Sequence, residues 1–173
     1  MNKSKIEIGI LGGSFDPAHK GHLAISKEAR KRFKLKKIIW AITKKNPLKA
    51  VSKTPVSKRI KDCKKLIGSN TFIKVKFYED TINSNKTIDL INYLKKNKKL
   101  EIFFLMGADN LISFHKWHKS KLITKKCNII VFDRHGYKKN SLKSKTFKKL
   151  NNKSLTFVKF KKVNISSSQL RKI

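Results

Sequence analysis

The fold of this chain is decided by one early stretch, Gly12-Gly13-Ser14-Phe15-Asp16-Pro17-Ala18-His19-Lys20-Gly21-His22-Leu23. An apolar run at residues 5–11 precedes it and is typical of a buried strand. A helix-like segment at residues 23–33 follows it. We therefore predict a strand, a glycine-rich turn and a helix start in direct succession.

Such a turn suits an anion. Glycines let backbone N–H groups come close to a bound group because no Cβ blocks the approach, and a helix start adds unpaired N–H groups and a positive dipole end. His19 and His22 are three residues apart, so both imidazoles can reach the same phosphate. The alternative is a plain glycine turn whose two histidines only cap a helix. The predicted phosphate site comprises Gly12, Gly13, Ser14, Phe15, His19 and His22.

The whole stretch resembles the GGxFDPxHxGH form of the HxGH motif of the nucleotidyltransferase superfamily. This form belongs to the adenylyltransferases, above all to the nicotinate-nucleotide adenylyltransferases. The resemblance implies that His19 and His22 stabilise charge on the transferred group. It also implies that backbone N–H groups of residues 13–15 orient the phosphates of ATP.

A second string follows the apolar strand expected at residues 100–106. It reads Met106-Gly107-Ala108-Asp109-Asn110-Leu111 and continues with Phe114-His115-Lys116-Trp117-His118. It resembles the GxDxLxxFxxW block of the same family, which implies that Gly107 and Asp109 bind ATP, with Asp109 on the adenosine ribose. Trp117 would stack on the nicotinate ring of the acceptor beside His118. The alternatives are a helix N-cap for Asp109 and core packing for Trp117.

A third string, Ile165-Ser166-Ser167-Ser168-Gln169-Leu170-Arg171, lies at the end of the chain. It resembles the family's ISSTxIR motif, with Ser168 and Leu170 as the departures. The resemblance implies a second ATP site formed by Ile165, Ser166, Ser167 and Arg171. There Arg171 would act with His19 and His22, and Mg²⁺ would bridge the oxygens of the leaving pyrophosphate. The alternative is a serine cap on a short terminal helix.

Looser matches place further residues at the acceptor. Lys49 ends a segment where the family commonly has PPHK, with no histidine here. Thr87 begins a YTxDTL-like segment in which Lys86 replaces the tyrosine, and Arg134 lies in a DRPGY-like turn with His135 in place of proline. With Trp117 and His118, these residues complete the predicted acceptor site: Lys49, Thr87, Trp117, His118 and Arg134.

The formal charge of +34 suggests a second class of function, in which the chain is a basic nucleic-acid-binding module. Only five of the 44 cationic residues are arginine, which is the preferred residue for phosphate and base contacts. Lysine is instead scattered together with many Asn, Ile and Phe, as AT-biased coding would produce. We therefore do not expect nucleic acid as a partner. No apolar run is long enough for a membrane span and no signal segment is visible, so we expect a cytoplasmic protein.

Strand-like and helix-like segments alternate along the chain, which predicts one α/β domain over residues 1–173 with a Rossmann-like, doubly wound and mainly parallel sheet. Ligands of such sheets bind at the carboxyl ends of the strands. We predict a helix in one or two pieces over residues 110–125, a mobile loop over residues 138–153 and a terminal helix over residues 166–173.

The resemblance implies transfer of the adenylyl group of ATP to nicotinate mononucleotide, with release of pyrophosphate. Nicotinamide mononucleotide and phosphopantetheine are alternative acceptors, and an inactive relative is a further alternative. The sequence leaves open whether the chain forms a homo-oligomer.

Overall fold

The computed structural model describes residues 4–46, 51–150, 153–160 and 170. Its centre is a six-stranded sheet in the order β3-β2-β1-β4-β5-β6, in which every neighbouring pair is parallel. Because β1 and β4 lie side by side and the chain winds outward from each, the sheet has a topological switch point between these two strands. The strands are β1 (Ile6–Gly13), β2 (Lys37–Ile42), β3 (Ile73–Phe77), β4 (Leu100–Gly107), β5 (Asn128–Phe132) and β6 (Leu155–Val158).

The alternation of side chains along β1 builds two cores. Ile8 and Ile10 belong to one buried cluster, and Leu11 belongs to the other. A Cβ on Gly9 would come within 2.6 Å of Ile38 Cδ1, so β1 has no room for a side chain at this point. Both faces of the sheet are therefore covered by packed layers, as a parallel sheet requires.

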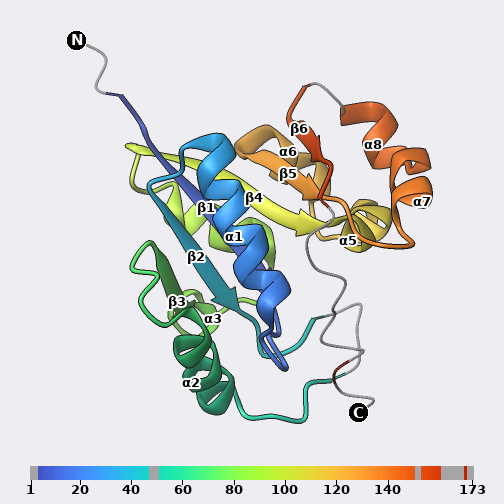
Figure 1. The fold of residues 1–173 in the computed structure, drawn as a ribbon. Coiled ribbons are helices and arrows are strands. Elements are labelled where there is room, and N and C mark those ends of the chain that lie inside the picture. The colour runs from blue at the N-terminus through green and yellow to red at the C-terminus, as the bar shows by residue number, and fades with distance from the viewer. Residues whose placement is uncertain (1–3, 47–50, 151–152, 161–169, 171–173) are drawn as a thin grey trace.

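Helices cover the two faces. Ala29 of α1 and Cys63 of α2 lie in one core, and α1 crosses the sheet in Figure 1. Ile88, Leu111 and Ile123 bring α4, α5 and α6 into the other core. The helices are α1 (Lys20–Phe33), α2 (Val56–Ile67), α3 (Glu79–Ile82), α4 (Thr87–Leu94), α5 (Ala108–Ser113), the 3₁₀ turn η1 (Phe114–Lys116), α6 (Ser120–Lys126), α7 (Lys138–Lys143) and α8 (Lys145–Leu150).

The predicted doubly wound parallel sheet is confirmed, the helical segment predicted in one or two pieces over residues 110–125 is present as two α-helices with a 3₁₀ turn between them, and one local prediction is wrong. The segment predicted as a mobile loop over residues 138–153 contains α7 and α8 (Figure 1). Phe147 and Leu150 pack against the core, and the Ser144 hydroxyl accepts a hydrogen bond from Phe147 N–H at the start of α8. The helical segment consists of α5, η1 and α6.

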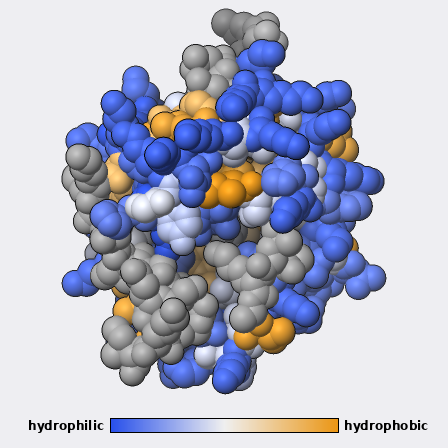
Figure 2. Space-filling model, turned by 90° about the vertical axis from the view of Figure 1, so that its right-hand side faces the viewer, coloured by the Kyte–Doolittle hydropathy of each residue, from blue (hydrophilic) through white to orange (hydrophobic). Residues whose placement is uncertain are grey.

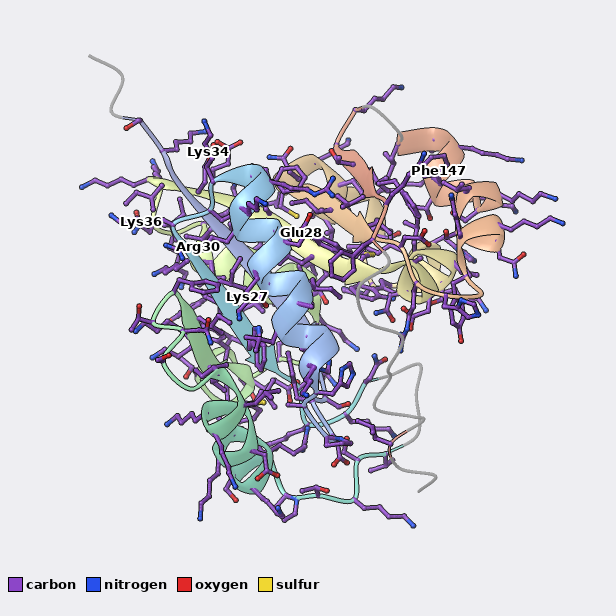
Figure 3. All side chains as sticks on the ribbon, viewed as in Figure 1. Lys27, Glu28, Arg30, Lys34, Lys36 and Phe147 are labelled. Carbon is purple, nitrogen blue, oxygen red and sulfur yellow. The ribbon has the colours of Figure 1, made fainter. Side chains whose placement is uncertain are left out.

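The surface carries the charge. The face in Figure 2 is mostly hydrophilic with small separate apolar patches, and charged side chains such as Lys27, Arg30 and Lys34 extend from the ribbon in Figure 3. In the described parts of the chain, no helix combines the length and apolar character that a bilayer crossing needs.

Candidate active site

The turn after β1 holds two histidines side by side. His19 is the N-cap of α1, and its Nδ1 accepts a hydrogen bond from Gly21 N–H at 3.1 Å. His22 Nδ1 accepts from His19 N–H at 3.2 Å, and the two ring centroids are 3.9 Å apart. The histidines therefore do cap the helix, as the alternative interpretation held. Because each Nδ1 is an acceptor, each neutral ring carries its proton on Nε2 and can donate from that nitrogen.

The ring of His22 packs against the aromatic rings of Phe15 and Trp40. Its ring centroid lies 4.6 Å from that of Phe15 and 5.9 Å from that of Trp40, and Phe15 stacks on Trp40 at 5.1 Å. The indole N–H of Trp40 donates to the Ser26 hydroxyl, which donates to the His22 carbonyl at 2.9 Å. The ring of His22 is thus oriented by buried neighbours, which is the preorganisation that a catalytic donor needs.

The second predicted string lies at the neighbouring strand end. Asp109 is the second residue of α5, and the N-cap is Gly107, so Asp109 does not have the capping role weighed above. A Cβ on Gly107 would lie 2.5 Å from Asp109 Oδ1, which explains the glycine. Asp109 Oδ2 accepts a hydrogen bond from Arg134 Nη1 at 2.7 Å in a partly buried ion pair.

Arg134 also reaches the histidine pair electrostatically. Burial, with a smaller contribution from the positive charge of Arg134, lowers the pKa of His19 from 6.5 to about 4. His19 is therefore neutral near pH 7. The ends of β1, β4 and β5 converge here, since His19, Asp109 and Arg134 each follow one of these strands. Arg134, predicted at the acceptor, lies with the predicted ATP residues.

A cavity of about 320 Å³ is lined by Gly12 and Gly13 at the end of β1 and by Asn110 next to Asp109. His19, His22, Asp109 and Arg134 are not among its lining residues. Five residues predicted for the two substrates line it: Gly12, Gly13, Thr87, Trp117 and His118. Ala41, Ile42, Ile82, Leu90 and Phe104 supply its apolar wall. The volume lies at the lower end of the range for small-molecule sites.

Trp117 is held at the cavity by two phenylalanines. Its ring meets Phe104 edge to face at 5.9 Å and lies 5.2 Å from Phe114. It therefore packs against the core, as the alternative interpretation held, and it also lines the cavity. A fixed indole beside an apolar wall suits a flat aromatic ring.

The described lining of the cavity contains two lysines and one carboxylate. The exposed Lys86 and Lys116 line it, and so does one carboxylate, Glu79 at the start of α3. Glu79 accepts hydrogen bonds from the Thr43 hydroxyl and from Lys44 N–H. Glu79 was not predicted as a site residue, although it follows β3 and the carboxyl ends of parallel strands share one edge of the sheet.

Several predicted site residues lie outside the described residues: Lys49, Ile165, Ser166, Ser167 and Arg171. The predicted meeting of Arg171 with the histidine pair therefore remains a prediction.

The chain is similar to known proteins both in sequence and in structure. Residues 10–173 match the family model described as cytidylyltransferase-like. A "probable nicotinate-nucleotide adenylyltransferase" of Pelagibacter ubique (strain HTCC1062) is 68% identical over 100% of this chain and 96% of its own length. A protein of the same name from Agrobacterium fabrum is 37% identical over 75% of this chain and 70% of its own length.

Among solved structures, the Plasmodium falciparum nicotinic acid mononucleotide adenylyltransferase complexed with NaAD superposes with a TM-score of 0.80. It is 22% identical, and the match covers 96% of this chain and 82% of that chain. This likeness supports the fold. Together with the matches in sequence, it leads to the conclusion that the chain belongs to the nicotinate-nucleotide adenylyltransferase family within the cytidylyltransferase-like nucleotidyltransferases.

Proposed function

We propose that this chain transfers the adenylyl group of ATP to nicotinate mononucleotide and releases pyrophosphate. An oxygen of the acceptor's 5′-phosphate forms a bond to the α-phosphorus of ATP. The bond from that phosphorus to the bridging oxygen breaks, and its electron pair leaves with pyrophosphate. The attacking oxygen is already anionic, so no covalent enzyme intermediate is needed, and catalysis consists of positioning and charge stabilisation.

One observation carries this proposal: two imidazoles that accept backbone hydrogen bonds at Nδ1 stand at the start of α1, and the two glycines that end the preceding strand line a cavity that also contains the indole of Trp117. His19 and His22 would donate to the oxygens of the α-phosphate as negative charge moves across it. Because His19 is neutral near pH 7, its contribution is a hydrogen bond rather than a full charge. Asp109, in its ion pair with Arg134, would accept from the ribose hydroxyls of ATP.

The cavity would hold the acceptor. Trp117 would stack on the pyridine ring, and Thr87 would supply the N–H group at the start of α4. Lys86 and Lys116 give the cavity two cations, while the carboxylate of Glu79 is engaged by Thr43 and Lys44. This balance favours an acceptor that carries an additional carboxylate, which supports nicotinate over nicotinamide.

The proposal includes Mg²⁺ as part of the substrate, bound to the phosphates of ATP. Over the described residues, no group of three or more His, Cys, Asp or Glu side chains is placed to hold a metal ion. Arg171 and Ser167 are proposed to hold the leaving pyrophosphate, as the resemblance implies. The high lysine content is proposed to be a solvated surface rather than a nucleic-acid site.

The test is a pyrophosphate-release assay with ATP·Mg²⁺ and a panel of nicotinate mononucleotide, nicotinamide mononucleotide and phosphopantetheine. We expect the highest kcat/KM with nicotinate mononucleotide. Release that does not depend on any of the three acceptors would refute the proposal. A higher kcat/KM with the amide would overturn only the choice of acceptor.

A further inference from the structure

Arg59 of α2 is a buried arginine with an unusual set of partners. Its residue surface is 2% exposed, and within the described residues its guanidinium donates to four backbone carbonyls. These are Thr54 O at 2.9 Å from Nε, Ser14 O at 2.6 Å and Thr43 O at 2.8 Å from Nη1, and Lys44 O at 3.4 Å from Nη2. Among the described ion pairs, none includes Arg59. Burying a cation costs free energy unless its N–H groups are hydrogen-bonded. The burial of an arginine at this position therefore needs a structural explanation.

The four carbonyls belong to two parts of the active site and to the start of α2. Ser14 lies in the phosphate turn after β1, and Thr43 lies in the loop after β2 and lines the acceptor cavity. A single nitrogen, Nη1, donates to both of these residues. The guanidinium therefore joins the turn that would hold ATP to the wall that would hold the acceptor.

The bond to Ser14 orients the peptide that would face the phosphates. In a trans peptide the carbonyl and the following N–H point in opposite directions, so fixing Ser14 O toward Arg59 directs Phe15 N–H away from it. Phe15 has φ of 50°, a left-handed conformation that is costly for a bulky residue. Its ring stacks on Trp40 while the preceding carbonyl is held by Arg59, so the strained residue is held on both sides.

The second loop is held in the same way. The peptide between Thr43 and Lys44 presents its carbonyl to Arg59 and its N–H to the carboxylate of Glu79. The Thr43 hydroxyl also donates to Glu79. Arg59 and Glu79 therefore hydrogen-bond to the carbonyl and to the N–H of the same peptide group in the cavity wall.

We infer that Arg59 is a positioning residue that fixes the phosphate turn relative to the acceptor cavity. The inference rests on the proposed function, because it assigns the two regions to the two substrates. Arg59 acts through Ser14 and Thr43 and does not itself reach the cavity lining given above. Its loss would misalign bound substrates by fractions of an ångström, and a displacement of about 1 Å can cost about a hundredfold in rate.

The main experiment compares Arg59→Lys with Arg30→Lys, an exposed arginine on α1 that lies over the Phe72 ring (Figure 3). Lysine keeps the charge, but one ammonium cannot reproduce the planar fork that meets four carbonyls. Per folded molecule, we expect Arg59→Lys to lower kcat by about tenfold to a hundredfold, and Arg30→Lys to stay within about twofold, as surface changes do. Folded fractions come from circular dichroism at the assay temperature.

Equal kcat values per folded molecule in the two variants would overturn the inference. If the unmodified enzyme shows no turnover, the proposed function fails instead, so the two failures are distinct.

A measurement on the unmodified enzyme covers the case in which the Arg59 variant does not fold. The guanidinium N–H signals of Arg59 can be followed by NMR while an unreactive ATP analogue or nicotinate mononucleotide is added separately. Because Nη1 contacts both loops, we expect each ligand alone to shift these signals. An absence of shift with either ligand would overturn the inference.

Discussion

The phosphate turn and the acceptor cavity are neighbours, but they are built differently. In the turn, both histidines are bonded to backbone N–H groups, and His22 packs against buried aromatic rings. In the cavity, the rings of Trp117 and Phe104 pack against the core, whereas Lys86 and Lys116 are exposed. Under the proposed function, the groups expected at the transferred phosphorus are held by packing and hydrogen bonds, whereas the cations expected to select the acceptor are exposed on the surface.

The largest effect on kcat is expected when one of the two imidazole donors is removed from the phosphate turn. For His22→Ala we expect kcat to fall by about a hundredfold to a thousandfold, as is found when a preorganised donor to a transition state is deleted. The pyrophosphate-release assay measures this, with His115→Ala on the exposed surface of η1 as the matched control. Unchanged kcat in His22→Ala would remove His22 from the catalytic set.

A smaller effect is expected from the fixed ring of the cavity. Replacing Trp117 by Ala should raise KM for nicotinate mononucleotide by about tenfold, because stacking on an aromatic side chain contributes about 1–3 kcal/mol. Trp117→Phe should recover part of the loss. The value of kcat should change little, since stacking on the pyridine ring would be made equally in the ground state and in the transition state. A fall in kcat with KM unchanged would contradict stacking on the acceptor.

A still smaller effect is expected from the exposed side chains. Lys86→Gln should reduce the preference for nicotinate over nicotinamide mononucleotide by about twofold to fivefold, since an exposed ion pair contributes at most about 1 kcal/mol. The control is Lys27→Gln on α1 (Figure 3), whose side chain is exposed and is not among the residues that line the cavity. A preference that is the same in both variants would assign the selection to other groups.

The pH dependence of stability tests the phosphate turn by a route independent of catalysis. The pKa of His19 is lowered to about 4 in the folded state, so the unfolded chain binds a proton first as pH falls below 6.5. The stability due to the neutral His19 is complete above pH 6.5 and is lost as pH falls toward 4. Urea unfolding at pH 7.5 and pH 5 should show a smaller difference for His19→Asn than for the unmodified chain. Identical differences would contradict the assignment.

The sequence could predict those parts of the molecule that depend on local patterns. The turn at residues 12–23 follows a strand and begins a helix, and its histidines are neighbours because three residues separate them. Asp109 and Trp117 were found in the same way, each from a string that follows a strand. These features are determined by the residues next to them in the sequence, so a local pattern is enough to predict them.

The parts that could not be predicted depend on contacts between distant segments. Arg59 meets Ser14, which lies 45 positions away, and nothing in the lysine-rich neighbourhood of Arg59 distinguishes it from an exposed cation. The ion pair of Arg134 with Asp109 joins two strings that are 25 positions apart, and neither string alone reveals it. In residues 138–153 the lysines concealed the apolar spacing of Phe147 and Leu150 that holds α8 on the core.

The chain contains two tryptophans, and the fold assigns one to each of the two regions compared above. Trp40 stacks on Phe15 beneath the histidine pair, whereas Trp117 lines the cavity. The intrinsic fluorescence of the protein therefore has two sources, one in each region. With Trp117 changed to Phe, the remaining tryptophan emission comes from Trp40 near the phosphate turn. Occupancy of the two substrate sites can then be followed separately, without attaching a dye to the protein.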